Sequence, residues 1–232
     1  ALASGRVAHA YLFAGPRGVG KTTTARLLAK ALLCLEHAGA EACGACAVCR
    51  DTGASVDVIE IDGASNRGIE EIRTLRENVK YAPARGRFKV YIIDEVHQLT
   101  EAAFNALLKT LEEPPAHVVF VLATTDPRDI PATVLSRVQR FDFRPIAPDA
   151  LATTLERILS EEKIPFEPAA LPTIVRAAEG SLRDALSLLD TAIAYGNGRL
   201  DASMAASLLG TTAPAEVRAF AAALLAHETA PA

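Results

Sequence analysis

The sequence has 232 residues, of which 50% are hydrophobic and 22% are charged, with a formal net charge of −4. A chain of this length and apolar content can bury a core as one large domain or as two smaller ones. The negative charge excludes overall basicity as a basis for nucleic-acid binding, so any such contact needs a local patch. Because no apolar stretch reaches transmembrane length and no signal-peptide pattern opens the chain, we expect a cytoplasmic protein without a membrane partner. We also expect that both ends belong to a longer natural chain.

The first predicted elements are a buried strand over 11–14, a glycine-rich loop and a helix that ends near Leu35. This order is the P-loop arrangement, in which backbone N–H groups and the helix N-terminus bind phosphates. Lys21 then reaches the β- and γ-phosphates, and the hydroxyl of Thr22 ligates Mg²⁺. The alternative is a glycine-rich turn without a ligand, but the flanking strand and helix favour nucleotide binding. The predicted nucleotide-binding residues are Gly15, Gly18, Val19, Gly20, Lys21, Thr22 and Thr23.

Four cysteines, the only ones in the sequence, follow the first helix: Cys34, Cys43, Cys46 and Cys49. They contain two overlapping C-x-x-C turns, a spacing that aims thiolates at one point and is typical of tetrahedral zinc. Two disulfides or a redox pair are the alternatives. Disulfides are disfavoured in the cytosol, and a redox pair does not need four clustered cysteines. Four protein ligands leave no open position on the metal, so the predicted zinc site is structural.

The next predicted strand covers 56–62 and is followed by a helix with Ile69 inside. A further apolar strand over 88–94 ends in Asp94 and Glu95, the Walker B pattern. We expect this strand to lie next to the P-loop strand, with Asp94 at the Mg²⁺ ion. Glu95 can then orient or deprotonate the water that attacks the γ-phosphate. The alternative is that two acids simply end a strand.

Thr100 is expected to cap a helix that stops at Pro114-Pro115, and strands follow over 118–123 and 139–143. Thr124 and Thr125 follow the first of these two strands, where they can contact the γ-phosphate or form an ordinary Thr-Asp turn. Strands that alternate with helices predict a parallel sheet covered on both faces. Ligands bind at the carboxyl ends of such strands, where the glycine loop, the acid pair and the threonine pair all fall.

Pro145 and Pro148 mark a predicted boundary, beyond which every pattern is helical. We expect helices that begin near Asp149, over 169–178, at Ser181, after Asp201 and over 214–226, with Ser181 as a helix cap. The expected domains are a nucleotide-binding core over 1–144, with the cysteine insertion at about 34–50, and a helical lid over 145–210. Residues 211–232 would begin a third domain.

Several stretches together resemble the bacterial DNA polymerase III gamma/tau family of clamp-loader ATPases. They are the phosphate loop, the cysteine cluster, the run YAPARGRFKVYIIDEVH at 81–97 and the run FNALLKTLEEPP at 104–115. The resemblance extends from residue 1 to about 212, and a four-cysteine insertion inside an AAA+ core marks this family. It implies a five-stranded AAA+ P-loop core with a zinc insertion, followed by an all-α lid domain. The last residues would begin the family's collar domain.

The resemblance also implies site residues. Thr125, with Thr124, matches the sensor 1 position, and Arg183 matches sensor 2 in the lid. Arg137 matches the arginine finger of a Ser-Arg-Cys motif, in which Val138 here replaces the cysteine; the finger acts on the ATP of a neighbouring subunit. Adenine would be held by a segment before residue 1, so no adenine-binding residue is assigned.

The implied activity is ATP hydrolysis, with Mg²⁺ and Zn²⁺ as further cofactors, to open the sliding clamp and load it on primed DNA. The implied partners are delta, delta-prime and other gamma/tau subunits, the clamp and DNA. Arg67, at the start of a helix, is a candidate phosphate contact, although a solvated loop is an equal alternative. Two other functions stay open. One is a nucleotide-operated binding module with negligible turnover. The other is a different AAA+ remodelling ATPase, against which the cysteine insertion argues.

Overall fold

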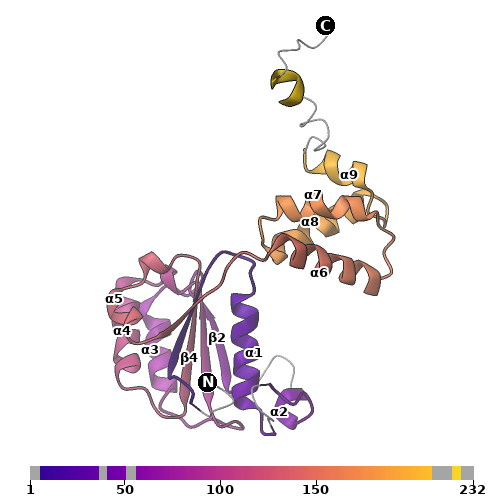
Figure 1. The fold of residues 1–232 in the computed structure, drawn as a ribbon. Helices are drawn as coiled ribbons and strands as arrows, with labels where there is room; N and C mark the ends of the chain where they lie inside the picture. The colour runs from indigo at the N-terminus through magenta and orange to yellow at the C-terminus, as the bar shows by residue number, and fades with distance from the viewer. Residues whose placement is uncertain (1–5, 37–40, 51–55, 211–220, 226–232) are drawn as a thin grey trace. The chain divides into compact units, whose positions relative to one another are not determined.

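The computed structural model describes residues 6–36, 41–50, 56–210 and 221–225. The chain divides into two compact units, Ala1–Arg144 and Pro145–Ala232, and each unit has its own hydrophobic core (Figure 1). Among the described residues, no helix combines the length and the apolar character needed to cross a membrane.

The first unit is built on a parallel sheet with the strand order β2-β3-β4-β1-β5. The strands are β1 (Ala10–Ala14), β2 (Val58–Asp62), β3 (Lys89–Asp94), β4 (Val118–Thr124) and β5 (Gln139–Asp142). The predicted five-stranded parallel sheet is therefore confirmed. The expectation that the strand of Asp94 lies next to the P-loop strand is wrong, because β4 lies between β3 and β1.

The composition of β4 explains its central position. All seven of its residues are buried, as a strand in the middle of a sheet covered on both faces requires. The sequence VVFVLAT meets this requirement without a charged side chain. Chain order does not reveal such an insertion, because a helical crossover can pass over a neighbouring strand position.

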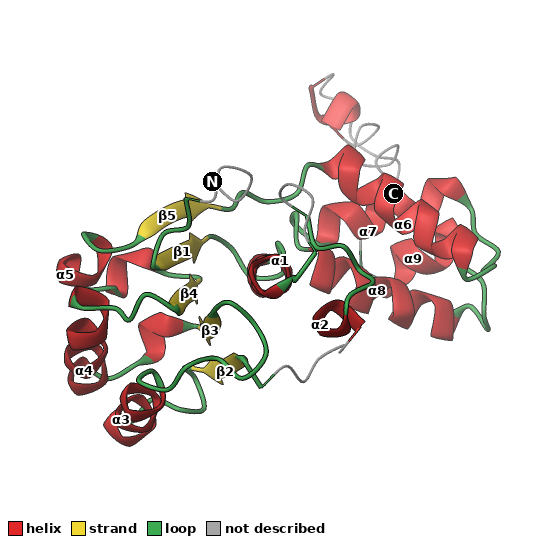
Figure 2. Ribbon diagram, turned by 90° about the horizontal axis from the view of Figure 1, so that it is seen from below, coloured by secondary structure: helices red, strands yellow, loops and turns green. Residues whose placement is uncertain are grey.

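Helices lie on both faces of the sheet (Figure 2), and alternate side chains of the strands pack into two separate cores. On one face, Tyr91 and Phe120 stack with ring centroids 5.5 Å apart, under α3 (Ile69–Asn78), α4 (Glu101–Glu112) and α5 (Ala132–Leu135). On the other face, residues such as Phe13 and Val121 pack against α1 (Lys21–Leu33). The sheet is thus held between helix layers. The side at which its parallel strands end, called the carboxyl edge below, is therefore a rigid platform.

The second unit is all-helical. It consists of α6 (Pro148–Glu161), η4 (Pro168–Ala170), α7 (Leu171–Ala177), α8 (Leu182–Tyr195) and α9 (Ala202–Leu208). Leu155, Ile174 and Leu189 lie in its core. The Ser181 hydroxyl accepts a hydrogen bond from the Asp184 N–H at 3.2 Å, so the predicted cap of α8 is confirmed. The helix expected over 214–226 lies mostly outside the described residues, of which 221–225 are helical.

Candidate functional site

The loop between β1 and α1 has the backbone of a phosphate-binding loop. Gly18 and Gly20 have φ values of 74° and 97°, in the left-handed region that glycine adopts without strain. Gly20 is the N-cap of α1 and supplies no side-chain cap. The first N–H groups of the helix therefore remain available to an anion, and the helix dipole adds partial positive charge there.

Lys21 is buried, with 6% of its surface exposed, at the start of α1. Its Nζ donates to the carbonyl oxygens of Gly15 at 2.9 Å and Pro16 at 2.7 Å. Burial lowers the pKa of this ammonium, and the negative charges of Glu95 and Asp94 oppose that shift. An ammonium has three donors, so these two carbonyls leave one N–H for an anion.

Thr22 and Asp94 meet at the carboxyl edge of the sheet, one from α1 and the other from β3. The Thr22 hydroxyl donates to Asp94 Oδ2 at 2.6 Å, and Asp94 Oδ1 accepts from the N–H of Glu95 at 2.9 Å. Hydroxyl and carboxylate oxygens are the ligands that Mg²⁺ prefers, usually beside water and phosphate oxygens. The donor set therefore fits a magnesium ion.

Glu95 and Thr125 also come together at this edge. Oε2 of Glu95 accepts hydrogen bonds from the backbone N–H of Thr125 at 3.2 Å and from its hydroxyl at 3.0 Å. Glu95 itself has a φ of 46°, a left-handed conformation that costs free energy in a non-glycine residue and is concentrated at functional sites. The carboxylate is thus held by Thr125, whose sensor role stays a prediction.

His97 belongs to the same cluster, and the sequence reasoning missed it. It lies in the short helix η2 (Val96–Gln98), which folds back immediately after the acid pair. Its Nδ1 lies 3.4 Å from Glu95 Oε2 and 3.0 Å from the Thr124 hydroxyl. The available signal was a histidine two residues after Glu95, but a lone histidine beside a strand end does not indicate where its ring points.

Arg137 lies near the amino ends of the strands, whereas the phosphate loop lies at their carboxyl ends. It precedes β5, whose first residue, Gln139, pairs with Tyr11 near the start of β1, whereas the loop follows the end of β1. A five-residue strand spans about 13 Å between its two ends because each residue rises about 3.3 Å. The length of β1 therefore separates the Arg137 backbone from the phosphate loop of its own chain.

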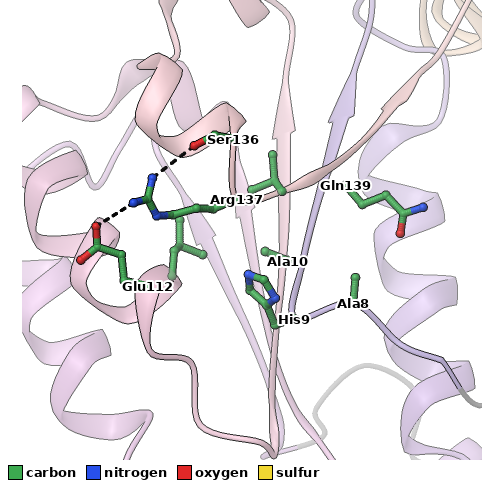
Figure 3. Close-up of a pocket in the computed structure, with 9 residues that line it drawn as sticks. Ala8, His9, Ala10, Glu112, Ser136, Arg137 and Gln139 are labelled. Atoms are coloured by element: carbon green, nitrogen blue, oxygen red, sulfur yellow. Dashed lines mark hydrogen bonds and ion pairs between the residues drawn. The ribbon is translucent and has the colours of Figure 1, made fainter.

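The guanidinium of Arg137 is engaged by its neighbours (Figure 3). Nη2 pairs with Glu112 Oε1 at 3.0 Å, and Nη1 donates to the Thr133 carbonyl at 2.6 Å and to the Ser136 hydroxyl at 3.2 Å. Arg137, Glu112 and Ser136 line a surface pocket of about 640 Å³, and 34% of the Arg137 side chain is exposed. The side chain can therefore be reached from outside the unit.

Two other arginines from the sequence analysis lie in separate places. Arg183 is exposed in the first turn of α8, in the second unit. Arg67 is exposed before α3, where its Nε donates to the Ala64 carbonyl at 3.0 Å. The functional roles of both residues remain predictions.

The four cysteines form one cluster between the end of α1 and the short helix α2 (Ala47–Arg50), with all four Sγ atoms within 4.8 Å of one another. Sγ of Cys43 and Sγ of Cys49 are 4.0 Å apart, far beyond a disulfide bond of about 2.05 Å. A tetrahedral metal with metal–sulfur bonds of about 2.3 Å spaces its sulfurs about 3.8 Å apart. The cluster therefore has the geometry to hold such an ion.

Backbone N–H groups point at the sulfurs of this cluster. The Cys43 N–H lies 3.3 Å from Cys34 Sγ, and the Cys49 N–H lies 3.4 Å from Cys46 Sγ. Such a contact from Cys43 lowers the pKa of Cys34, and backbone contacts led by Leu35 lower the pKa of Cys46 to about 6. Burial instead raises the pKa of Cys49 to about 12. Donors that stabilise thiolates are what a metal site needs, because the ligand is the deprotonated sulfur.

The parallel sheet, the phosphate loop, the acidic end of β3 and the separate helical unit define the class: this is an AAA+ P-loop ATPase fold. Among solved structures, the chain is similar to the RuvB Holliday junction branch migration motor of Thermotoga maritima, with a TM-score of 0.63 and 20% identity over 89% of this chain and 62% of that one. It is also similar to a DNA polymerase III gamma subunit-related protein of Thermotoga maritima, with a TM-score of 0.54 and 24% identity over 78% of this chain and 52% of that one. At these identities the likeness concerns the fold.

Sequence comparison gives the family. Residues 1–147 match the family model of the DNA polymerase III delta subunit, and residues 150–198 match that of the clamp-loader ATPase lid domain. The chain is 57% identical over 90% of its length to the DNA polymerase III tau subunit of Salmonella typhimurium, and 54% identical over 84% to that of Bacillus subtilis. The chain therefore belongs to the DNA polymerase III gamma/tau family, as its motifs predicted. It spans about a third of the length of these relatives, 33% and 35% respectively.

Proposed function

We propose that this chain is the ATP-binding and ATP-hydrolysing part of a bacterial clamp-loader motor subunit, which opens the sliding clamp and loads it on primed DNA in the cytoplasm. The observation that supports this most strongly is the convergence at one sheet edge. The edge brings together the start of α1 with Lys21 and Thr22, the end of β3 with Asp94 and Glu95, and Thr125 directly after β4. Each of these residues lies within hydrogen-bond distance of another of them or of the loop. Delta, delta-prime and further gamma/tau subunits are the proposed partners.

Each residue has a distinct task in this proposal. Lys21 and the first N–H groups of α1 bind the β- and γ-phosphates. Thr22 and Asp94 would hold Mg²⁺, which neutralises charge on the phosphates when bound. Glu95 orients the attacking water and takes its proton, and Thr125 donates to the γ-phosphate from the end of β4. Gly15, Gly18, Val19, Gly20 and Thr23 complete the loop around the nucleotide.

Arg137 is proposed to act on the nucleotide of a neighbouring subunit. Its backbone lies near the amino ends of the strands, and its side chain is accessible. To act on the nucleotide of its own chain, the side chain would have to reach along the full length of β1. An arginine supplied in trans contributes about 10³–10⁵ in rate to related NTPases by stabilising charge in the transition state. Arg183, from the lid unit over 145–210, is the proposed sensor 2. The collar that brings subunits together is proposed to begin in residues 211–232.

The cysteine cluster is proposed to hold one structural Zn²⁺ ion. Four sulfurs with backbone donors leave no open coordination position for a substrate, so the ion would stabilise the insertion and take no part in hydrolysis.

The proposal is tested with the full-length protein assembled with its partner subunits, the clamp and primed DNA. We expect Glu95→Gln to keep ATP binding and to lower the hydrolysis rate by about 10²–10⁴, the usual contribution of a general base. Hydrolysis at the wild-type rate by the Glu95→Gln assembly would show that Glu95 is not the base.

Mixed assemblies test Arg137 separately. We expect Arg137→Ala to silence the site on the adjacent subunit and to spare the site of its own chain when the neighbour is wild type. Failure of the mutant's own site beside a wild-type neighbour would mean that Arg137 acts within its chain.

A second candidate function follows from the same position of Arg137. A single chain has no finger at its own phosphates, so the isolated fragment is proposed to be a nucleotide-binding module with very slow turnover. Both behaviours hold together if the fragment binds ATP alone and hydrolyses it only in the assembly.

A further inference from the structure

His97 is a mostly buried histidine next to the proposed general base. Only 10% of its side chain is exposed, against 29% for Glu95. Its Nδ1 faces two oxygens, Oε2 of Glu95 at 3.4 Å and Oγ1 of Thr124 at 3.0 Å. The ring is therefore placed between the end of β3 and the end of β4.

The neighbours of the ring determine which nitrogen carries the proton. The side-chain amide nitrogen of Gln98 lies 2.8 Å from His97 Nε2. An amide nitrogen can only donate, so Nε2 of the neutral ring accepts and the proton lies on Nδ1. That N–H donates to Thr124 Oγ1 at 3.0 Å, and Glu95 Oε2 lies 3.4 Å from the same nitrogen. The Thr124 hydroxyl also accepts from the Asp126 N–H at 3.1 Å, so this oxygen does not depend on His97 for a donor. The Glu95 carboxylate is a charged acceptor and therefore the stronger one.

The other partner of Glu95 has competing demands. The Thr125 hydroxyl has one hydrogen, which it gives to Glu95 Oε2 at 3.0 Å. If Thr125 turns that hydrogen to the γ-phosphate, Glu95 keeps the Thr125 backbone N–H, and the Nδ1–H of His97, 3.4 Å away, is close enough to turn from Thr124 to the carboxylate. Of these, His97 is the one side-chain donor that has no role toward the nucleotide.

We propose that His97 is a positioning residue that holds the Glu95 carboxylate in place for the attacking water while Thr125 contacts the γ-phosphate. This inference rests on the proposed function, because it takes Glu95 as the base. His97 does not touch ATP in this arrangement. It acts through the carboxylate, whose misplacement by about 1 Å is enough to cost up to about a hundredfold in rate.

Two amide substitutions separate this role from simple packing. The amide nitrogen of His97→Asn lies near the position of Nδ1, so it can still donate to Glu95. The amide of His97→Gln lies near the position of Nε2 and loses that donor. In the full assembly with clamp and primed DNA, we expect His97→Gln to lower kcat for ATP about tenfold or more and His97→Asn to retain most of it. ATP affinity is expected to change less than about threefold in both, because Lys21 and the loop are untouched.

Two results would overturn the proposal. One is a wild-type kcat for His97→Gln. The other is an equal loss of kcat in both variants that follows an equal loss of thermal stability, which would indicate a packing role. If His97→Gln does not fold, Gln98→Leu replaces it: this variant keeps the ring but removes the donor that fixes the proton on Nδ1, and we expect kcat to fall several-fold. An unchanged kcat there would also refute the proposal.

Glu95→Gln, measured in parallel, keeps the two proposals apart. If Glu95→Gln hydrolyses ATP at the wild-type rate, the assignment of the base fails and His97 has nothing to position. If Glu95→Gln is inactive and His97→Gln is not impaired, only the role of His97 is wrong.

Discussion

The nucleotide edge of the sheet and the cysteine cluster gather reactive groups in opposite ways. At the sheet edge, the groups satisfy one another: Lys21 donates to loop carbonyls, Thr22 to Asp94, and Thr125 to Glu95. In the cluster, four sulfurs surround one point, and those of Cys43 and Cys46 accept from backbone N–H groups of their own turns. At the sheet edge, side chains that are hydrogen-bonded to one another must give up some of these bonds when a ligand binds. In the cluster, the four sulfurs already surround the position that an ion would take.

The two regions also differ in what supports them. The sheet edge is fixed by β1, β3 and β4, whose strands are packed between helix layers. The cluster is fixed mainly by local turns near α2 and by Cys34 at the end of α1. We therefore expect substitutions at the edge to change function with little effect on stability, and substitutions in the cluster to do the reverse.

The largest expected effect is loss of the metal from the cluster. Cys46→Ser removes one thiolate, and structural zinc sites contribute on the order of 10 kcal/mol of binding free energy that is coupled to folding. We expect elemental analysis of the reduced protein to fall from one zinc per chain to well below one, with a lower melting temperature. ATP affinity should change little. Loss of ATP binding with unchanged stability would contradict the contrast between the two regions.

Lys21→Ala is the counterpart at the sheet edge. It removes a charged hydrogen-bond donor to the phosphates, worth about 1.5–3 kcal/mol, so we expect ATP affinity to fall about tenfold to a hundredfold. The melting temperature of the nucleotide-free protein should change little, because a buried ammonium is also removed. Titration with a fluorescent ATP analogue and thermal unfolding measure the two quantities. A large loss of stability with intact affinity would contradict the assignment.

Asp57 sharpens the comparison because its carboxylate is hydrogen-bonded as fully as those of the sheet edge, but only to backbone groups of a loop. Its oxygens accept from the backbone N–H groups of Ala84 at 2.6 Å, Arg85 at 2.8 Å and Gly86 at 2.8 Å. Asp57→Asn leaves one acceptor oxygen for three donors, and we expect a loss of about 1–3 kcal/mol of unfolding free energy at pH 7 with no change in ATP affinity.

The same carboxylate predicts a pH dependence. Burial raises the pKa of Asp57, but the three N–H donors outweigh it and hold the pKa below its usual value of 3.8. A carboxyl whose pKa is lower in the folded state stabilises the fold above its unfolded pKa, which is this usual value, and loses that contribution as pH falls through the folded pKa. Urea denaturation should therefore show a smaller difference between wild type and Asp57→Asn at pH 3 than at pH 7. An equal difference at both would refute this.

How far the sequence leads depends on whether a feature is local. The glycine spacing before Lys21 and the two C-x-x-C turns carry their geometry within a few residues, so both regions could be found from the sequence. The placement of β4 between β3 and β1 depends on how helical crossovers pass the sheet, which no short stretch encodes. His97 was missed for a related reason, because its role comes from the ends of two strands that only the folded sheet brings together.

The smallest expected effect concerns Arg67, the predicted DNA phosphate contact. It is exposed and precedes Gly68, the N-cap of α3, which supplies no side-chain cap, so the helix N–H groups are open to a phosphate. Glu70 and Glu71 in the first turn of α3 oppose this with negative charge. We therefore expect Arg67→Ala to weaken DNA binding by the full assembly only slightly, with a salt slope reduced by about one.

A matched control decides whether Arg67 makes a contact or only adds charge. Arg73 lies on the same helix, is exposed and is paired with Glu70, so Arg73→Ala removes the same charge without a predicted phosphate contact. DNA affinity measured at several salt concentrations should show the reduced slope for Arg67→Ala and the wild-type slope for Arg73→Ala. Equal slopes in the two variants would assign the effect to the overall field. An unchanged slope for Arg67→Ala would show that Arg67 makes no contact with a DNA phosphate.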